Sequence, residues 1–316
     1  MIKIVNVNSG KKAPLEEQVF AQYGAEYNCV VTKTAEELIE AGQGAQVILF
    51  TAARFTAEVF DCLPELRLLV RYGIGYDTVD LAAARERNVD VCNAPSYGAV
   101  DVAEHTFTLL LSANRKIISY DANVRAGQFG GSGEYNAFRL CGKTLGLIGF
   151  GRIARHVVKF AQGFGMEVVT YDPYIETSAV EAMEARAIGF EELLRTADFV
   201  SLHTPLNDKT YHMIGTREFT LMKPSAVLIN TARGALVDEN ALFEALKARN
   251  IRAAGIDVYE NYPRELGNPF HALDNIVLTP HIAFNTVEAV EALHEEVTEE
   301  VVRFLQGKPN LNIVNR

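Results

Sequence analysis

The sequence has few cysteines, and none of them form a pair at a metal-binding spacing. Cys29, Cys62, Cys92 and Cys141 lie far apart, with no Cys-x-x-Cys pair and no histidine nearby at ligand spacing. This pattern favours structural free thiols over a disulfide framework or a cysteine-based zinc site. None of the other ligand spacings that a metal site requires is present, so no metal is predicted.

Long apolar runs and an excess of basic residues are also missing. No apolar run approaches the length of a membrane span, and residues 2–7 are typical of a first strand rather than of a signal peptide. The 40 acidic residues outnumber the 30 basic ones, and the formal charge of −10 argues against a general nucleic-acid surface. We therefore expect a cytoplasmic protein with no membrane and no nucleic acid among its partners.

What the sequence does have is a regular alternation of strand and helix signals. The 316 residues exceed what one core usually supports, and the hydrophobic content of 48% rules out disorder. Strands are predicted near residues 3–7, 27–31, 46–50, 68–71, 89–92, 144–148, 167–171, 199–202, 226–230, 253–257 and 276–278. Long helices are predicted over 101–118, with Asp101 as N-cap, and over 286–305, and Thr34 to Glu37 forms a capping box.

This alternation predicts an α/β fold with two doubly wound parallel-sheet domains. The strands up to residue 92 suffice for a flavodoxin-like sheet, and the later strands suffice for a Rossmann-like sheet. If the second domain occupies the middle of the chain, the last helix can return to the first. We therefore predict a discontinuous domain of residues 1–98 plus 286–316 and an inner domain of residues 99–285.

A glycine-rich motif in mid-chain identifies the inner domain as the nucleotide-binding one. The strand over 144–148 runs into Gly149-Phe-Gly151, and a helical pattern follows from Arg152. Two glycines allow a tight turn whose backbone approaches a pyrophosphate, and Ala154 in the third position lets the helix lie against the strand. The helix N-terminus then faces the phosphates.

An acidic residue completes this motif. Asp172 ends the next predicted strand, 21 residues after Gly151. A carboxylate there can accept hydrogen bonds from both ribose hydroxyls of NAD and repel the 2′-phosphate of NADP. The alternative is an ordinary strand-end aspartate before Pro173. We predict NAD as the cofactor.

Three polar residues follow later strands of the same predicted sheet. Arg233 comes after 226–230, Asp257 ends 253–257, and His281 follows 276–278 and a proline. The carboxyl ends of parallel strands face the ligand crevice, where the guanidinium of Arg233 can grip a carboxylate through two hydrogen bonds. Taken singly, Arg233 could instead cap a helix or form an ion pair, Asp257 could cap a helix or loop, and His281 could be structural. Their convergence beside a nicotinamide-type motif favours catalysis.

The order of these motifs resembles that of the D-isomer-specific 2-hydroxyacid dehydrogenases. The resemblance includes Asn230-Thr-Ala-Arg-Gly234, Asp257-Val-Tyr259 and Thr279-Pro-His-Ile282. It extends to Arg71-Tyr-Gly-Ile-Gly-Tyr-Asp77 and to the segment from Asn93 to His105, so that it spans nearly the whole chain.

The resemblance implies an NAD-dependent oxidoreductase (EC 1.1.1.-) with its active site in the cleft between two domains. Arg233 would bind the carboxylate and carbonyl of a 2-oxoacid or 2-hydroxyacid, and His281 would be the general acid and base. Asp257 would hold the nicotinamide carboxamide. Gly149, Gly151, Arg152, Ile153, Asp172, Thr204, Thr231, Arg233, Asp257 and His281 are the expected cofactor-binding residues, and the Gly73-Ile74-Gly75 backbone would bind the substrate carboxylate.

One position departs from the family pattern. The family usually has a glutamate, the partner of the catalytic histidine, just before a proline, where this chain has Tyr262 before Pro263. A carboxylate beside a histidine favours the imidazolium, whereas a tyrosine gives no such charge. Glu260 or Glu265 could reach the histidine instead. If Tyr262 is the partner, we expect reduction to fall off at lower pH than in relatives with the glutamate.

The substrate and the partner are less sharply indicated. Arg71 could bind a second anionic group of the substrate or be a surface arginine, and Tyr97 could line the substrate cavity. The resemblance implies a homodimer formed through the nucleotide domains and the segment 114–138, which is either an extended arm or a surface loop. An NAD(H)-sensing protein of the corepressor type, with weak or no turnover, is the alternative function.

Overall fold

The chain forms two compact units, each built around a parallel sheet. We describe a computed structural model, in which residues 1–129, 137–260 and 268–316 are described. Unit 1 comprises Met1–Gly98 and Asn285–Arg316, and unit 2 comprises Ala99–Phe284.

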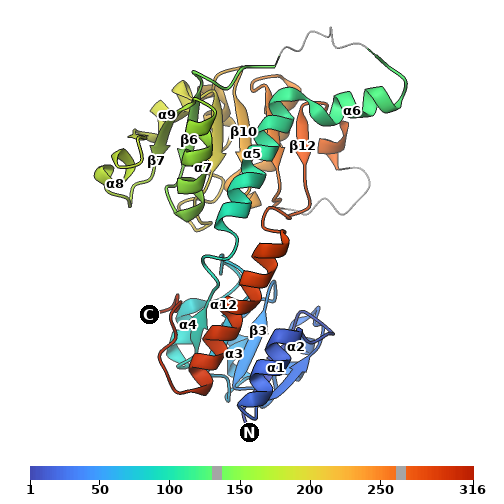
Figure 1. The fold of residues 1–316 in the computed structure, drawn as a ribbon, viewed down its shortest axis with the longest axis vertical. Coiled ribbons are helices and arrows are strands. Elements are labelled where there is room, and N and C mark those ends of the chain that lie inside the picture. The colour runs from blue at the N-terminus through green and yellow to red at the C-terminus, as the bar shows by residue number, and fades with distance from the viewer. Residues whose placement is uncertain (130–136, 261–267) are drawn as a thin grey trace. The chain divides into compact units, whose positions relative to one another are not determined.

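Unit 1 combines a sheet with helices, among them α1 to α4 and α12 (Figure 1). The sheet is parallel and has five strands in the order β2-β1-β3-β4-β5. This is the flavodoxin-like order that the sequence predicts. The strands are β1 (Lys3–Asn6), β2 (Glu26–Cys29), β3 (Val47–Phe50), β4 (Leu68–Arg71) and β5 (Asp90–Cys92). The helices are α1 (Pro14–Gln22), α2 (Ala35–Gly42), α3 (Ala57–Asp61), α4 (Leu81–Glu86) and α12 (Val287–Leu305). The last helix, α12, packs against α1 and β4 and buries Leu293, Val297 and Val301 in the core of this unit.

Unit 2 has a seven-stranded parallel sheet in the order β12-β11-β10-β9-β6-β7-β8 (Figure 1). The strands are β6 (Thr144–Ile148), β7 (Glu167–Tyr171), β8 (Arg186–Ala187), β9 (Phe199–Leu202), β10 (Val227–Asn230), β11 (Ala253–Ile256) and β12 (Ile276–Leu278). The helices are α5 (Ala99–Arg115), α6 (Ile117–Arg125), α7 (Arg152–Gly163), α8 (Thr177–Glu181), α9 (Phe190–Thr196), α10 (Thr216–Leu221) and α11 (Glu239–Lys247), with 3-10 turns η1 (Gly234–Leu236) and η2 (Pro269–Ala272). The strand order reverses between β6 and β9, which is where such sheets bind their ligands.

These two sheets confirm the predicted fold class, and three local predictions need correction. Helix α5 begins at Ala99, so Asp101 lies in its first turn and is not its N-cap. The helix predicted to run to Ile118 stops at Arg115, because Lys116 is left-handed (φ 51°), and α6 starts after it. Glu37 accepts the amide of Lys33 rather than that of Thr34, although Thr34 caps α2 as expected.

In the described part of the chain, none of the helices combines the length and the apolar character that a membrane span needs. Across residues 1–129, 137–260 and 268–316, no cluster of three or more His, Cys, Asp or Glu side chains could hold a metal ion. The four cysteines are free; Cys92 is buried, whereas Cys62 and Cys141 are exposed and do not belong to the core.

Candidate active site

The glycine-rich turn connects β6 to α7 in unit 2. Gly149 is left-handed (φ 96°), and a Cβ at this position would lie 2.5 Å from the carbonyl oxygen of His203 and 2.9 Å from the amide nitrogen of Thr204. Only glycine fits so close to the β9 loop. Gly151 is the N-cap of α7, and a Cβ there would meet no described atom within 4 Å. Gly151 therefore leaves space beside the N-terminus of a twelve-residue helix, the kind of position at which anions bind.

Asp172 is tied directly to this turn. Its Oδ2 accepts the amide of Phe150 at 2.9 Å, and its Oδ1 accepts the amide of Tyr174 at 2.9 Å. The amide of Gly149 in turn donates to the carbonyl of Tyr171 at 2.9 Å. The carboxylate is thus held half-buried beside the turn.

The remaining predicted cofactor residues surround this turn. Arg152 is exposed and Ile153 is half-buried in the first turn of α7, while Ala154 is fully buried against the sheet. Thr204 follows His203, whose pKa burial lowers to about 4, so that this imidazole is neutral near pH 7. His203 Nε2 lies 2.9 Å from Ser201 Oγ.

The ends of β10, β11 and β12 lie side by side in the sheet. Asn230 is in register with Ile256, and Ile256 is in register with Leu278. The segments that carry Arg233, Asp257 and His281 therefore leave the sheet at the same edge. Unit 2 thus brings the three polar residues to neighbouring strand ends, as the sequence indicates.

Asn230 shapes the loop that carries Arg233. Its Oδ1 accepts the amide of Ala232 at 3.0 Å, and its Nδ2 donates to the carbonyl of Arg233 at 2.8 Å. The next residue, Gly234, is pressed against the segment after β11, because a Cβ on it would lie 1.9 Å from the carbonyl carbon of Tyr259. The glycine after the arginine is therefore a packing requirement, which the sequence alone does not reveal.

Asp257 shapes the loop that carries His281. Its side chain is 0% exposed. Oδ1 accepts the Thr279 hydroxyl at 2.6 Å and the amide of Ile282 at 3.0 Å, and Oδ2 accepts the amide of Ala283 at 3.0 Å. The contact of Asp257 with a nicotinamide carboxamide stays a prediction. The structure shows a buried side chain that holds the His281 loop through three hydrogen bonds.

His281 has an unusual backbone conformation within this loop. Its φ is 59°, in the left-handed region, and its amide donates to the carbonyl of Asp257 at 2.8 Å. A residue other than glycine in this region carries a conformational cost of about 1–3 kcal/mol, which persists only where the surroundings fix it. The bonds to Asp257 on both sides of His281 fix it here.

The predicted partners of His281 in the segment after β11 are only partly described. Tyr262 and Glu265 lie outside the described residues. Glu260 is described: its Oε1 accepts the Tyr211 hydroxyl at 2.9 Å, and its Oε2 lies 2.8 Å from His212 Nε2. Glu260 therefore pairs with the β9–α10 connection, and the idea that it reaches His281 instead is not supported by these contacts.

The predicted substrate residues lie in unit 1. Arg71 ends β4, and its guanidinium lies over Gly73, where a Cβ would be 2.1 Å from Nη1. Gly73 has a φ of 138°, and Ala94 donates to its carbonyl at 3.1 Å. Asn93 Nδ2 donates to the carbonyl of Ile74 at 2.7 Å. The loop is thus held by the segment after β5, and Gly75 in the loop and Tyr97 just after that segment are half-buried.

A buried polar cluster supports this loop, and sequence reasoning missed it. Glu16 of α1 is fully buried and accepts the hydroxyls of Tyr27 and Tyr72, the latter at 2.5 Å. His294 Nδ1 of α12 lies 2.8 Å from Glu16 Oε1, and this contact raises the pKa of His294. Glu16 stands on a helix whose pattern gives no sign of burial at that position, so that only the fold reveals it.

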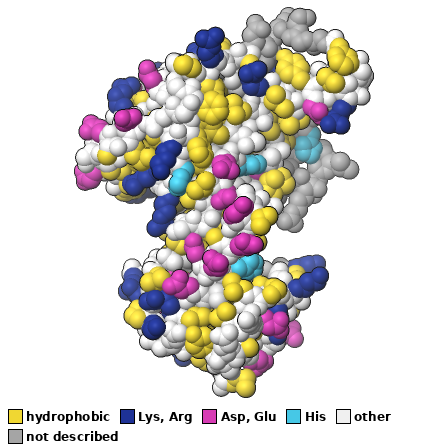
Figure 2. All heavy atoms as spheres, viewed as in Figure 1, with side chains coloured by type: hydrophobic (Ala, Val, Ile, Leu, Met, Phe, Trp, Pro, Cys, Tyr) yellow, Lys and Arg dark blue, Asp and Glu magenta, His cyan; other side chains and the backbone are white. Residues whose placement is uncertain are grey.

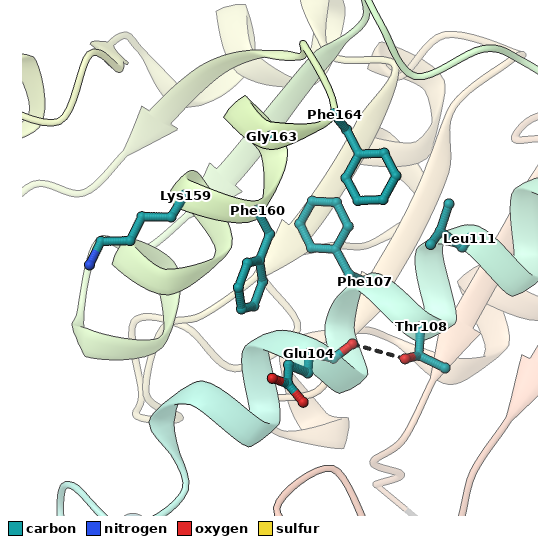
Figure 3. A pocket seen from close by; sticks show the side chains of 8 residues that line it. All are labelled: Glu104, Phe107, Thr108, Leu111, Lys159, Phe160, Gly163 and Phe164. Atoms are coloured by element: carbon teal, nitrogen blue, oxygen red, sulfur yellow. Dashed lines mark hydrogen bonds between the residues drawn. The ribbon is translucent and has the colours of Figure 1, made fainter.

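A groove of about 430 Å³ runs between α5 and α7 (Figure 3). Phe107 stacks on Phe164 with ring centroids 5.5 Å apart and meets Phe160 edge to face at 5.8 Å. None of its lining residues is among the predicted site residues. The lining residues are Glu104, Phe107, Thr108, Leu111, Lys159, Phe160, Gly163 and Phe164.

Comparison with known proteins identifies relatives of this arrangement. Residues 107–283 match the family "D-isomer specific 2-hydroxyacid dehydrogenase, NAD binding domain". A glyoxylate reductase of Thermococcus litoralis is 42% identical over 265 residues, covering 82% of the chain and 80% of the relative. A D-3-phosphoglycerate dehydrogenase of Methanocaldococcus jannaschii is 41% identical over 284 residues, covering 89% of the chain. The chain spans only 54% of that second relative's length.

Solved structures show the same fold with two different cofactors. An acyclic imino acid reductase in complex with NADPH and D-Arg superimposes with a TM-score of 0.91 at 30% identity, covering 99% of this chain and 100% of the other. A D-lactate dehydrogenase of Aquifex aeolicus complexed with NAD and lactic acid gives a TM-score of 0.87 at 27% identity, covering 96% of each chain.

Proposed function

The chain belongs to the D-isomer specific 2-hydroxyacid dehydrogenase family, and we propose that it transfers a hydride between NAD(H) and a small 2-oxoacid/D-2-hydroxyacid pair. One observation carries the proposal. Arg233 and His281 follow neighbouring strand ends, on loops held by the buried Asn230 and Asp257, in the unit that contains the glycine-rich turn.

The proposed residues divide the chemistry between them. NADH, when bound, supplies the hydride for the carbonyl carbon of the substrate. Arg233 binds the carboxylate through two hydrogen bonds and polarises the carbonyl. His281 in its imidazolium form gives a proton to the carbonyl oxygen, and in the oxidative direction it takes the proton back. The Gly73, Ile74 and Gly75 backbone amides of unit 1 are proposed to hold the substrate carboxylate, with Arg71 and Tyr97 lining the site.

A screen of substrates tests this proposal directly. We expect the protein to oxidise NADH in the presence of at least one of glyoxylate, hydroxypyruvate, pyruvate and phosphohydroxypyruvate. The decrease in NADH absorbance measures the rate. Fluorescence titration with NADH in the absence of substrate serves as the control for cofactor binding. Tight NADH binding with no turnover of any of the four would overturn the proposal in favour of an NAD(H)-sensing protein.

The preference for NAD over NADP is proposed to depend on Asp172. A carboxylate fixed by the amides of Phe150 and Tyr174 would meet a 2′-phosphate as a like charge. We expect Asp172→Ser to lower kcat/KM for NADH and to raise it for NADPH. The ratio of the two kcat/KM values should change by about 100-fold, which corresponds to about 2.8 kcal/mol because each 1.4 kcal/mol is tenfold. Kinetics with both cofactors measure the ratio. An unchanged ratio would show that another residue decides the preference.

We propose unit 2 as the NAD-binding domain and unit 1 as the substrate domain.

We also propose a homodimer formed through unit 2. Helix α6 buries none of its residues, and Ile118 and Phe129 are 61% and 87% exposed. Hydrophobic side chains also gather over α5 and α7 on the face seen in Figure 2, which agrees with the groove between these helices. Apolar surface of this kind is typical of an interface. The proposed location is the cytoplasm, which suits free thiols.

The dimer proposal has a direct test in solution. We expect light scattering to give twice the mass of the chain for the native protein. A charge in a buried apolar interface is costly, so Ile118→Glu should shift the protein towards the monomer. Val31→Glu, which changes a valine of unit 1 that is 53% exposed against 61% for Ile118, is the matched control and should leave the mass unchanged. A monomeric native protein would contradict the proposal.

A further inference from the structure

We infer that two consecutive side chains of α5, His105 and Thr106, position the two loops that carry His281 and Arg233, so that one helix sets the place of both. The inference rests on the proposed function and adds two positioning residues to it. All the residues concerned lie in unit 2.

His105 reaches the His281 loop through a hydroxyl relay. His105 Nε2 lies 3.0 Å from Thr279 Oγ1, and the Thr279 hydroxyl donates to Asp257 Oδ1 at 2.6 Å. Both carboxyl oxygens of Asp257 act as acceptors, and the single hydroxyl proton of Thr279 is used in the bond to Oδ1. The oxygen of Thr279 must therefore accept from Nε2–H of His105. The same Nε2 lies 3.6 Å from Asp257 Oδ1, which is beyond hydrogen-bond distance, so the Thr279 hydroxyl links the two side chains.

This relay ends at the carboxylate that holds the His281 loop. Asp257 accepts the amides of Ile282 and Ala283, and its carbonyl accepts the amide of His281. The left-handed backbone of His281 is thus fixed by bonds before and after it. If His105 is removed, Thr279 loses its donor, and its hydroxyl is free to turn away from Asp257. The loop then loses part of what holds His281 in this conformation.

Thr106 reaches the Arg233 loop in the same way. Its hydroxyl donates to the carbonyl of Val102 at 2.8 Å, so its oxygen accepts from the Thr231 hydroxyl at 3.0 Å. Both threonines are buried. Thr231 stands two residues before Arg233, just as Thr279 stands two residues before His281. Thr231 is one of the expected cofactor-binding residues, and its hydroxyl is bonded to Thr106 of α5.

Helix α5 is itself fixed on the sheet. It packs across β10 and β11, and Gly255 in β11 lets it approach so closely that a Cβ there would lie 2.8 Å from the Cβ of Leu109. A helix held by such backbone packing can transmit its own position to both loops. Since the hydrogen bonds start from adjacent residues, the spacing of the two loops follows from the helix.

Paired variants distinguish positioning from a merely structural role. We expect His105→Leu to lower kcat about tenfold while the KM for NADH changes less than about twofold, because one buried hydrogen bond is lost. His105→Gln, which keeps a donor at the position of Nε2, should recover most of kcat. Thr106→Val should instead raise the KM for the oxoacid about tenfold, because Arg233 binds the carboxylate. Each variant thus serves as the control for the other.

Hydrogen exchange read by mass spectrometry gives a test that needs no turnover. We expect faster exchange at Ile282 and Ala283 in His105→Leu but not in Thr106→Val, and faster exchange over residues 231–236 in Thr106→Val only. A protein without turnover that shows this pattern would overturn the proposed function and leave the positioning intact. If His105→Leu does not fold, Thr279→Val and Thr279→Ser delete and keep the same hydroxyl.

Two results would overturn the inference. One is native kcat together with native exchange in His105→Leu or Thr279→Val. The other is a loss of kcat that His105→Gln fails to recover while the melting temperature falls equally in both variants, because that result would show only a loss of stability.

Discussion

Replacing His281 with glutamine is expected to lower kcat for 2-oxoacid reduction by about 10²- to 10⁴-fold, which is the usual contribution of a positioned general acid. Glutamine can still donate a hydrogen bond to the carbonyl oxygen, but it cannot give up a proton to it. NADH should bind the variant with nearly the native Kd, because the glycine-rich turn and Asp172 lie on other strands of unit 2. Steady-state kinetics and NADH fluorescence measure the two quantities.

The matched control for this variant is His271→Gln. His271 is an exposed histidine in η2 of the same unit, and its replacement should leave kcat unchanged. A His281→Gln protein with native kcat would show that another group supplies the proton. A variant with native kcat and a raised KM for NADH would show that His281 binds the cofactor without supplying the proton.

Arg233→Lys is the second change with a large expected effect. Lysine keeps the positive charge but has neither the planar fork nor the two parallel donors of arginine. We expect kcat/KM for the oxoacid to fall by about 10²- to 10³-fold, as happens when a donor to a developing oxyanion is removed. The Kd for NADH should change far less. Kinetics with varied oxoacid and direct titration with NADH separate the two effects.

Arg195→Lys is its control, because Arg195 forms an exposed pair with Glu191 within α9. Exposed ion pairs of this kind contribute little to the stability of a protein. Equal losses in the two lysine variants would point to a general loss of stability, and an unaffected Arg233→Lys protein would contradict the assignment of the carboxylate to Arg233.

The fold class, and the strand ends from which the candidate site residues follow, were predictable because they depend on local patterns. The strands β6, β7 and β12 were predicted with the bounds they have, since each is an apolar run closed by a glycine or a polar residue. Helix α6 was not separated from α5, because Ile117 and Ile118 continue the apolar pattern across the left-handed Lys116. Hydrophobic periodicity does not register a single residue in that conformation.

What the sequence could not provide is how the polar residues at the strand ends are connected. Asp257 and Thr279 are 22 positions apart, and His105 lies 174 positions before Thr279. Such bonds follow from the packing of α5 on the sheet and not from spacing along the chain. The burial of Glu16 was equally hidden, because the charged face of α1 meets partners from β2, the end of β4 and α12.

The return of α12 to unit 1 has a consequence for synthesis on the ribosome. Unit 1 needs Leu293, Val297 and Val301 for its core, so its first 98 residues cannot complete that core until α12 has emerged. Unit 2 is continuous in sequence and can fold while α12 is still in the exit tunnel. During this interval the strands β1 to β5 expose apolar surface. A chaperone that binds this surface would do so before α12 can cover it.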